Sequence, residues 1–233
     1  MKDTATFRRT AVAVSLVAAP VLAILSVALQ PPFTQGYADR LADLDRAGAA
    51  AWLSNTAFIV LQVPMVVAFL GIAHLLRRQS PRLSNVGGSL GVLATFGEAV
   101  MGGVAMVWLT MASDAAHRET FAGVWERLEN SPVMMFGLVG FLGTTLTIIL
   151  LSIGLFRSRI VPRWVPALLG AFLALEFVGS NVSEFSSYAG GLCLLIAFGA
   201  LAAHVWDTPR SAWDVPVENT PALAPSAPHT RPH

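Results

Sequence analysis

The hydrophobic residues of this chain fall into six long runs that are separated by polar segments. As a helix, a run of about 18 residues or more is long enough to cross about 30 Å of hydrocarbon. The pattern therefore predicts an all-α, polytopic membrane protein with six transmembrane helices. The runs are Thr10–Leu29, Trp52–Leu76, Val86–Met111, Pro132–Phe156, Trp164–Val182 and Ser187–Trp206. The fifth run is the shortest and the most polar of the six.

Two of the connections between these runs also have a composition that favours helix. They are Ala38–Ala51 and Ala112–Asn130. In the second, Phe121, Trp125 and Leu128 recur at spacings of three and four residues, with Val124 beside them, and form one apolar stripe. We therefore predict two extracytoplasmic amphipathic helices that lie in the membrane interface or cap the bundle.

The positive charges are distributed unequally between the two sides that six crossings would create. With a cytoplasmic N-terminus, eleven of the 15 Lys and Arg residues fall on the inside, as expected for cytoplasmic loops. Four arginines, Arg78, Arg82, Arg159 and Arg163, are candidate anchors of the inner loops at the anionic leaflet. The chain also has the Arg-, Ala- and Gly-rich composition of high-GC bacteria. We therefore predict a bacterial inner-membrane protein with both termini in the cytoplasm.

Composition supports the membrane class and excludes several others. The chain of 233 residues is 55% hydrophobic and 12% charged, whereas a soluble domain carries about 25% charged residues. Its net charge of +1 and its lack of a basic stripe argue against a nucleic-acid partner. The single cysteine, Cys193, excludes an internal disulfide and a cysteine-based zinc site.

The chain divides into a six-helix transmembrane domain, residues 1–206, and a proline-rich tail, residues 207–233. The tail holds six prolines and little apolar mass, so we predict that it is disordered and cytoplasmic. The first run, although preceded by Lys2, Arg8 and Arg9, is longer than the apolar region of a signal peptide, which favours a retained anchor.

Two carboxylates interrupt the apolar runs. Glu98 and Glu176 each lie about 12 residues from the inner end of their run, which is about 18 Å along a helix. A charge at this depth is costly, so we expect each group to be protonated, paired or exposed to water. Glu98 shares its helical face with Gly91, Gly102 and Ala105, and a small-residue face of this kind packs against another helix.

Other polar residues accompany these acids in the outer half of the predicted membrane. They are Asn55, Gln62, Thr144, Ser180, Asn181 and Glu184. The inner half is almost entirely aliphatic. This distribution predicts a polar cavity that opens outward and is closed inward. Two carboxylates at one depth could share a proton there, and such a pair relays protons or binds a cation.

No cofactor or metal site is predicted. His74 and His204 lie near inner helix ends and could ligate haem, but a single pair of interfacial histidines is a weak signal. Asp114, His117 and Glu119 match no standard zinc spacing, and there is no phosphate-binding loop or hydrolase motif.

The segment "LFRSRIVPRWVPALLG" carries a family resemblance. Its turn, from Arg157 or Arg159 through Pro162, Arg163 and Trp164, resembles the junction between the fourth and fifth helices of an uncharacterised family of small six-helix bacterial integral membrane proteins. That family is common in actinobacteria and has no established activity. The resemblance implies a six-helix fold across residues 10–205 and supplies no catalytic residues.

Three functions remain open from the sequence. The first is proton- or cation-linked transport, with Glu98 and Glu176 as carriers. The second is a non-catalytic membrane subunit or anchor, whose buried acids only join helices and which acts as a homodimer or with a membrane protein partner. The third, the least favoured, is an enzyme at the outer face that uses Glu176, Glu184 or His117.

Overall fold

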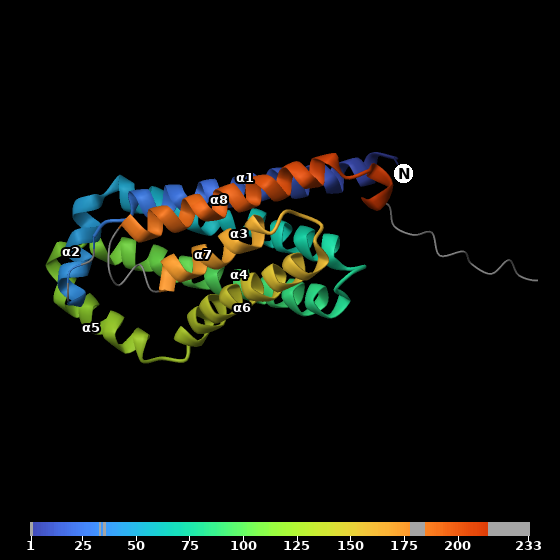
Figure 1. Ribbon diagram of the computed structural model, residues 1–233. Coiled ribbons are helices and arrows are strands. Elements are labelled where there is room, and N and C mark those ends of the chain that lie inside the picture. Colours follow the sequence, from blue (N-terminus) through green and yellow to red (C-terminus); the bar gives the residue numbers. More distant parts are fainter. Residues whose placement is uncertain (1, 33, 35, 178–184, 214–233) are drawn as a thin grey trace, which may run out of the picture.

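In the computed structural model, the described residues are 2–32, 34, 36–177 and 185–213, and they form helices joined by turns, without a strand (Figure 1). The α-helices are α1 (Lys2–Leu29), α2 (Tyr37–Ala47), α3 (Ala49–Leu76), α4 (Pro81–Ala112), α5 (Arg118–Glu129), α6 (Met134–Ser158), α7 (Trp164–Phe177) and α8 (Phe185–Asp207). Two short 3₁₀ helices are η1 (Ala115–His117) and η3 (Arg210–Trp213). The predicted all-α class is confirmed.

Five of these helices, α1, α3, α4, α6 and α8, are long and apolar enough to cross a membrane. They correspond to five of the six predicted runs. The remaining run contains α7, which is apolar but has only 14 residues, or about 21 Å of helix. The rest of that run, residues 178–182, lies outside the described residues.

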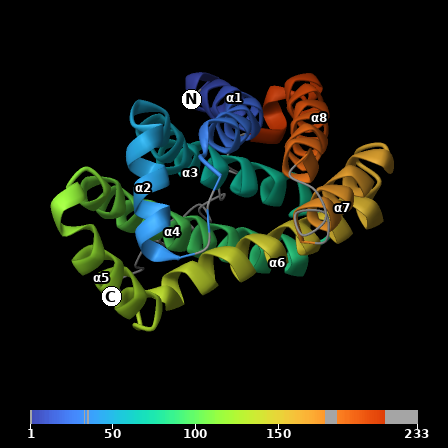
Figure 2. The same ribbon diagram turned by 90° about the vertical axis from the view of Figure 1, so that its left-hand side faces the viewer.

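The six long or apolar helices of the bundle form a closed ring in which each packs mainly against two neighbours, and α3 also touches α6 across the ring. The order around the ring is α1, α3, α4, α6, α7 and α8, and α8 returns to α1 (Figure 2). Short turns join α3 to α4 and α6 to α7, so the helices of each of these pairs are antiparallel. The two amphipathic helices lie outside this ring: α2 and α5 pack against each other and against the end of α4, as Figure 1 shows.

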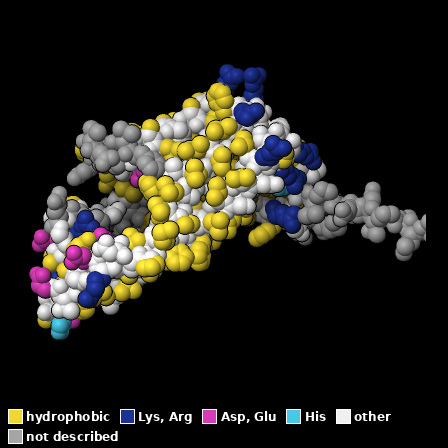
Figure 3. Space-filling model, turned by 90° about the horizontal axis from the view of Figure 1, so that it is seen from below, with side chains coloured by type: hydrophobic (Ala, Val, Ile, Leu, Met, Phe, Trp, Pro, Cys, Tyr) yellow, Lys and Arg dark blue, Asp and Glu magenta, His cyan; other side chains and the backbone are white. Residues whose placement is uncertain are grey.

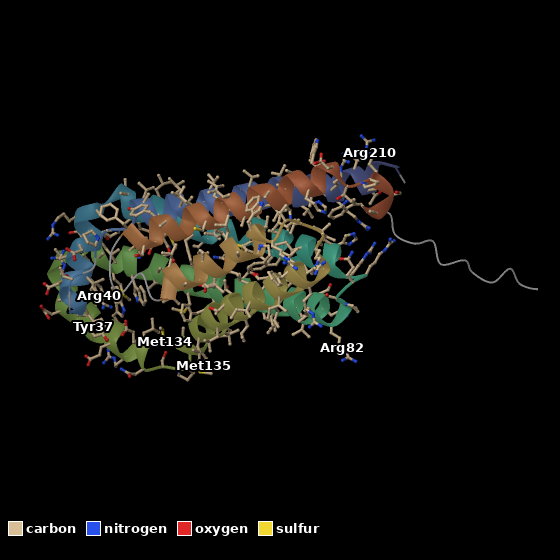
Figure 4. All side chains as sticks on the ribbon, viewed as in Figure 1. Tyr37, Arg40, Arg82, Met134, Met135 and Arg210 are labelled. Atoms are coloured by element: carbon tan, nitrogen blue, oxygen red, sulfur yellow. The ribbon has the colours of Figure 1, made fainter. Side chains whose placement is uncertain are left out.

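The two ends of the bundle differ in charge. One end, called here the arginine end, carries Arg8, Arg9, Arg77, Arg78, Arg82, Arg157, Arg159, Arg163 and Arg210. The opposite end, called the α2–α5 end, carries the acidic residues of α2 and α5. Figure 3 shows a group of Lys and Arg side chains at one end, Asp and Glu side chains mixed with some Lys or Arg side chains at the other, and an apolar band between them. In Figure 4, Arg82 and Arg210 mark the arginine end, and Tyr37 and Arg40 mark the α2–α5 end.

The apolar band is exposed in the way that a lipid-facing surface requires. Side chains of four different helices are between 52% and 71% exposed there: Val14 (α1), Val63 (α3), Phe96 and Val107 (α4) and Ile196 (α8). A soluble protein rarely leaves so continuous an apolar surface uncovered. The exposed surface therefore agrees with the helix lengths in indicating a multi-pass membrane protein.

Two hydrophobic clusters fill the interior. The larger one runs through the centre of the ring to the arginine end and contains Phe69, Leu76, Leu155 and Phe198, each at most 1% exposed. The smaller one joins α2, α5 and the end of α4 around Leu41 and Trp125. The larger cluster closes the bundle towards the arginine end.

Glycines let α4 approach α6 until their backbones touch. A Cβ added at Gly97 would lie 2.5 Å from the carbonyl oxygen of Phe136 and 2.7 Å from the nitrogen of Gly140. One added at Gly143 would lie 2.9 Å from the Cβ of Ala94. These contacts fix the height of α6 against α4, and with it the surroundings of Glu98.

The folded part of the chain continues beyond the predicted boundary at residue 206. α8 runs to Asp207, and η3 then turns back so that Trp213, 2% exposed, stacks on His74 of α3 with ring centroids 4.6 Å apart. The prediction of a disordered tail starting at residue 207 is therefore wrong for residues 207–213, because Trp213 supplies the apolar mass that the proline count concealed. Residues 214–233 lie outside the described residues.

Candidate functional site

A cavity of about 340 Å³ lies at the α2–α5 end, between α1, α2, α3, α4 and α5. This volume is at the lower end of the range for small-molecule sites. The lining side chains include a polar floor, an aromatic wall and a charged rim. They come from Ser26, Gln30, Pro31, Arg40, Leu44, Ala51, Ser54, Asn55, Phe58, Ala105, Trp108, Leu109, Trp125 and Glu129.

The floor of the cavity is formed by polar side chains of α3. Ser54 Oγ donates a hydrogen bond to the carbonyl oxygen of Ser26 at 2.7 Å, and Asn55 Nδ2 donates one to that of Gly102 at 3.0 Å. The first bond joins α3 to α1, and the second joins α3 to α4. Both donors are used in contacts between helices, and these contacts hold the floor rigidly. The Asn55 Oδ1 atom is left to accept a hydrogen bond from a bound molecule.

The aromatic wall is a stacked pair of indoles. The rings of Trp108 (α4) and Trp125 (α5) lie parallel within 13°, with centroids 4.0 Å apart. Trp125 is 3% exposed, and its Nε1 donates a hydrogen bond to Glu129 Oε1 at 2.9 Å. The sequence pattern places Trp125 on an apolar stripe, and the structure confirms that this stripe packs inward.

The rim is a set of donors that converge on one carboxylate, Glu129. Tyr37 donates its hydroxyl to Glu129 Oε2 at 2.7 Å, and Arg40 Nη1 lies 3.7 Å from Oε1. The hydrogen bond to Glu129 raises the pKa of the Tyr37 hydroxyl. Because Arg40 offsets the charge of Glu129 and the walls are aromatic, the cavity suits a small organic molecule with an apolar body.

The polar residues predicted from the sequence are distributed differently from the prediction. Asn55 lines this cavity. Gln62, 7% exposed, donates its Nε2 to the carbonyl oxygen of Phe58 on its own helix, and Thr144 is half-buried on α6. Ser180, Asn181 and Glu184 lie outside the described residues. Among the described residues, Asn55, Gln62 and Thr144 therefore do not line one common cavity.

Glu98 points into the bundle, as its small-residue face predicts. Its carboxyl group lies against Gly140, where an added Cβ would be 3.0 Å from Oε1. Ile59 packs on Gly102, and Phe69 packs on Gly91, which fixes the register of α3 against α4. In this register Gln62 is level with Glu98. Glu98 lies one helical turn beneath Gly102, whose carbonyl oxygen anchors Asn55 in the cavity floor.

Glu176 lies elsewhere. Its Oε2 would be 3.7 Å from a Cβ at Gly190 of α8, and the residue lines a separate cavity of about 120 Å³ between α1, α7 and α8. Since α6 stands between α4 and α7 in the ring, Glu98 and Glu176 face different neighbours. The predicted proton-sharing pair is therefore not formed. Equal depth in the sequence does not make two helices adjacent.

His117, which the sequence offers as a residue of an outer-face enzyme, makes a local contact with Asp114. His117 Nδ1 lies 2.9 Å from Asp114 Oδ2, and this hydrogen bond lowers the pKa of the Asp114 carboxyl. Neither residue lines the cavity. In the part of the chain that the structure describes, no three His, Cys, Asp or Glu side chains gather to hold a metal ion.

The four predicted loop anchors all lie at the arginine end. Arg78 lines a small cavity near the ends of α3 and α8, and Arg82 opens α4. Arg159 caps α6 in the left-handed region with φ 55°, and Arg163 lies 5.3 Å from the ring of Phe156.

Sequence reasoning missed the residues that form the wall and rim. Trp108, Arg40 and Glu129 are far apart in the chain and carry no motif. Their only signal was the amphipathic character of the two outer connections, which predicted helices packed over the end of the bundle. Comparison with known protein families, with curated proteins and with solved structures finds no match to this chain.

Proposed function

We propose that this protein is a multi-pass protein of the bacterial inner membrane that binds a small, largely apolar organic molecule from the outer side, as the loading step of transport. The observation that carries the proposal is the cavity between the stacked Trp108–Trp125 pair and the Ser54–Asn55 floor. It opens at one end of the bundle, and a packed aliphatic core lies beneath it. One open and one closed end is the arrangement of an outward-facing transporter.

Charge supports this orientation. The positive-inside rule supports a cytoplasmic arginine end, and in that orientation the cavity would face the outside. The connection of the helices supports six crossings: α6 ends and α7 begins at the arginine end, and α8 returns there to meet Arg9, whose Nη1 donates to the carbonyl oxygen of Trp206. If the chain leaves the arginine end with α7 and returns to it with α8, it crosses the membrane twice over these two helices. Both termini would then be cytoplasmic.

Proton or cation linkage is a further part of the proposal, and it rests on Glu98. This acid is half-buried, lies beneath the cavity floor and turns its carboxyl group towards Gly140 of α6. Intramembrane acids that face a bundle interior commonly form proton or ion pathways. Glu176 is not required, because it faces α8 on the other side of α6.

A second candidate function is a non-catalytic membrane subunit or anchor. The observation that favours it is that Glu98 and Glu176 each pack against a glycine of a neighbouring helix, Gly140 and Gly190. A carboxyl group that forms a hydrogen bond between helices would contribute about 0.6–2 kcal/mol and needs no ligand. In that case the cavity would bind no solute, so the two functions are separable by experiment.

The test is binding by the protein in lipid nanodiscs, followed by calorimetry. Three probes of similar shape differ in charge: indole is neutral, phenylethylammonium is a cation and benzoate is an anion. The variant Ala105→Phe fills the cavity from α4. The matched control is Val107→Phe, which adds a ring to the same helix at a position 52% exposed to lipid.

We expect indole to bind the parent and the Val107→Phe control and to lose affinity at least tenfold in Ala105→Phe. A preference for phenylethylammonium that Ala105→Phe also abolishes would assign the cavity to cations, as the sequence predicted. If none of the three probes binds the parent, or if Ala105→Phe binds as well as Val107→Phe, the solute site is refuted and the subunit function remains. Uptake of the bound probe into proteoliposomes then tests transport itself.

A further inference from the structure

A second cavity, of about 160 Å³, lies at the arginine end, where α3 and α8 end and η3 turns back over them. Its lining residues are His74, Leu75, Arg77, Arg78, Ile160, His204, Thr208, Ala212 and Trp213. Every ionisable side chain in this list is cationic or can become so. Within the described ranges, no carboxylate lines the cavity.

The cavity has a fixed frame made by the chain itself. The carbonyl oxygen of Ala212 lies 3.2 Å from His74 Nε2 and accepts a hydrogen bond from Arg77 Nη2 at 3.2 Å. The indole of Trp213 stacks on the His74 ring at an interplanar angle of 15°. Arg77 therefore keeps most of its five N–H donors for another acceptor.

An independent observation points to a ligand. Trp213 is 2% exposed, and its indole Nε1–H is buried with no acceptor among the described residues. An unpaired donor buried in this way is costly, because it has lost its bond to water and gained nothing in return. Trp213 lines the cavity, so an acceptor bound there would pair with it.

We propose that this cavity binds a phosphate-bearing anion. A phosphate group offers several strong acceptor oxygens, and arginine is the side chain best suited to bind it with paired hydrogen bonds. Basic pockets between transmembrane helices at the cytoplasmic side bind lipid head groups by the same chemistry. The anion therefore comes from an anionic phospholipid or from a soluble phosphate, and both would meet Arg77, Arg78 and the Trp213 Nε1–H.

This proposal is independent of the solute site. The two cavities lie at opposite ends of the bundle, and the hydrophobic core around Phe69 and Leu155 separates them. An anion here would fasten η3 to α3 and α8, and so hold the chain where it leaves the bundle.

The experiment uses the full-length protein in phosphatidylcholine nanodiscs, with calorimetric titration of inorganic phosphate. A second set of nanodiscs contains phosphatidic acid, and native mass spectrometry counts the lipids retained by the protein. Three variants decide the site. Arg78→Gln removes a charge that makes no hydrogen bond in the described structure, and Trp213→Phe keeps a ring against His74 but removes the Nε1–H. Arg82→Gln is the control, since Arg82 lies at the same end but outside this cavity.

We expect Arg78→Gln and Trp213→Phe each to weaken anion binding about tenfold, and Arg82→Gln to leave it within twofold of the parent. Binding of inorganic phosphate identifies a soluble source, and retention of phosphatidic acid without phosphate binding identifies a lipid source. The proposal is overturned if neither anion binds the parent, or if Arg82→Gln weakens binding as much as the two cavity variants. Monodisperse elution and an unchanged melting temperature show that each variant is folded.

Discussion

The close contact between α4 and α6 allows a quantitative test of the packing around Glu98. In Gly97→Ala, the new Cβ would lie 2.5 Å and 2.7 Å from two backbone atoms of α6, whereas ordinary contact begins at 3.4 Å. Backbone atoms cannot rotate away as a flexible side chain can. The two helices must therefore separate by most of an ångström, which also loosens the contacts of Gly140 with Glu98 and of Gly143 with Ala94.

The expected change in the free energy of unfolding is the sum of two effects. Overpacking costs about 1–3 kcal/mol, and the rigid backbone neighbours favour the upper part of that range. Replacing glycine by alanine inside a helix restores about 1 kcal/mol of helix propensity. Gly97→Ala is thus expected to be about 2 kcal/mol less stable than the parent. The matched control is Gly103→Ala, six residues along the same helix, where a Cβ meets nothing within 4 Å and only the propensity gain remains.

The two alanine variants should consequently differ by about 3 kcal/mol. At about 2–4 °C per kcal/mol for a chain of this size, this corresponds to about 6–12 °C in melting temperature. Thermal unfolding in nanodiscs, followed by tryptophan fluorescence, measures the difference. Equal melting temperatures for Gly97→Ala and Gly103→Ala would refute the close α4–α6 contact, and with it the placement of Glu98 against Gly140.

Three other substitutions test the site and its surroundings. Glu98→Gln keeps the size and the hydrogen-bonding capacity of the side chain, so folding and indole binding should stay intact. The pH dependence of uptake into proteoliposomes should be abolished. Unchanged pH dependence would exclude Glu98 as the coupling acid. Trp125→Phe keeps an aromatic ring against Trp108 but loses the hydrogen bond to Glu129. The free energy of unfolding should fall by about 1–3 kcal/mol. A fall of less than about 0.5 kcal/mol, the least that one net hydrogen bond contributes, would contradict the rim geometry. The hydrogen bonds from Thr34 lower the pKa of the Asp43 carboxyl from its usual value of 3.8. Their stabilisation is present above that usual value and is lost as the pH falls through the lower pKa of the folded state. At such acid pH, hydrogen exchange at the start of α2 should accelerate in the parent but not in Asp43→Asn, and equal acid sensitivity in both would contradict this assignment.

The fold class followed from the sequence because membrane helices impose a strong and simple pattern. A run such as Trp52–Leu76 must satisfy its backbone hydrogen bonds within itself, so its length and hydropathy are sufficient to predict a helix. The two outer helices were predicted for a related reason, since the stripe through Phe121 and Trp125 has one apolar face. The count of six was harder, because the fifth run is short and polar and α7 has only 14 residues.

The arrangement of the candidate site could not be read from the sequence in the same way. Depth along a helix is a local property, and it correctly placed Glu98 and Glu176 within the apolar runs. Which helices are neighbours depends on the ring order, which interposes α6 between those two acids. The cavity wall and rim depend on how α2 and α5 fold back over α4, and this brings Glu129 to Tyr37, 92 positions away in the chain.

The tail shows how composition can conceal a local contact. Six prolines after residue 206 predicted disorder for the whole segment. A single buried indole, Trp213, was enough to fold the first part of it against His74. A proline count describes the average of a segment, whereas one buried aromatic side chain can order the few residues next to it.

Thiol accessibility in intact bacteria tests whether the cavity opens to the outside. Ser54 is 7% exposed and lines the cavity, so in a Cys193→Ala background a Ser54→Cys thiol should react with a membrane-impermeant maleimide added outside. The reaction should be blocked when Ala105→Phe fills the cavity, and Ser84→Cys, 4% exposed at the arginine end, should stay unmodified. Labelling of Ser54→Cys only in inverted vesicles, or unchanged labelling with the cavity filled, would contradict an outward-facing binding cavity.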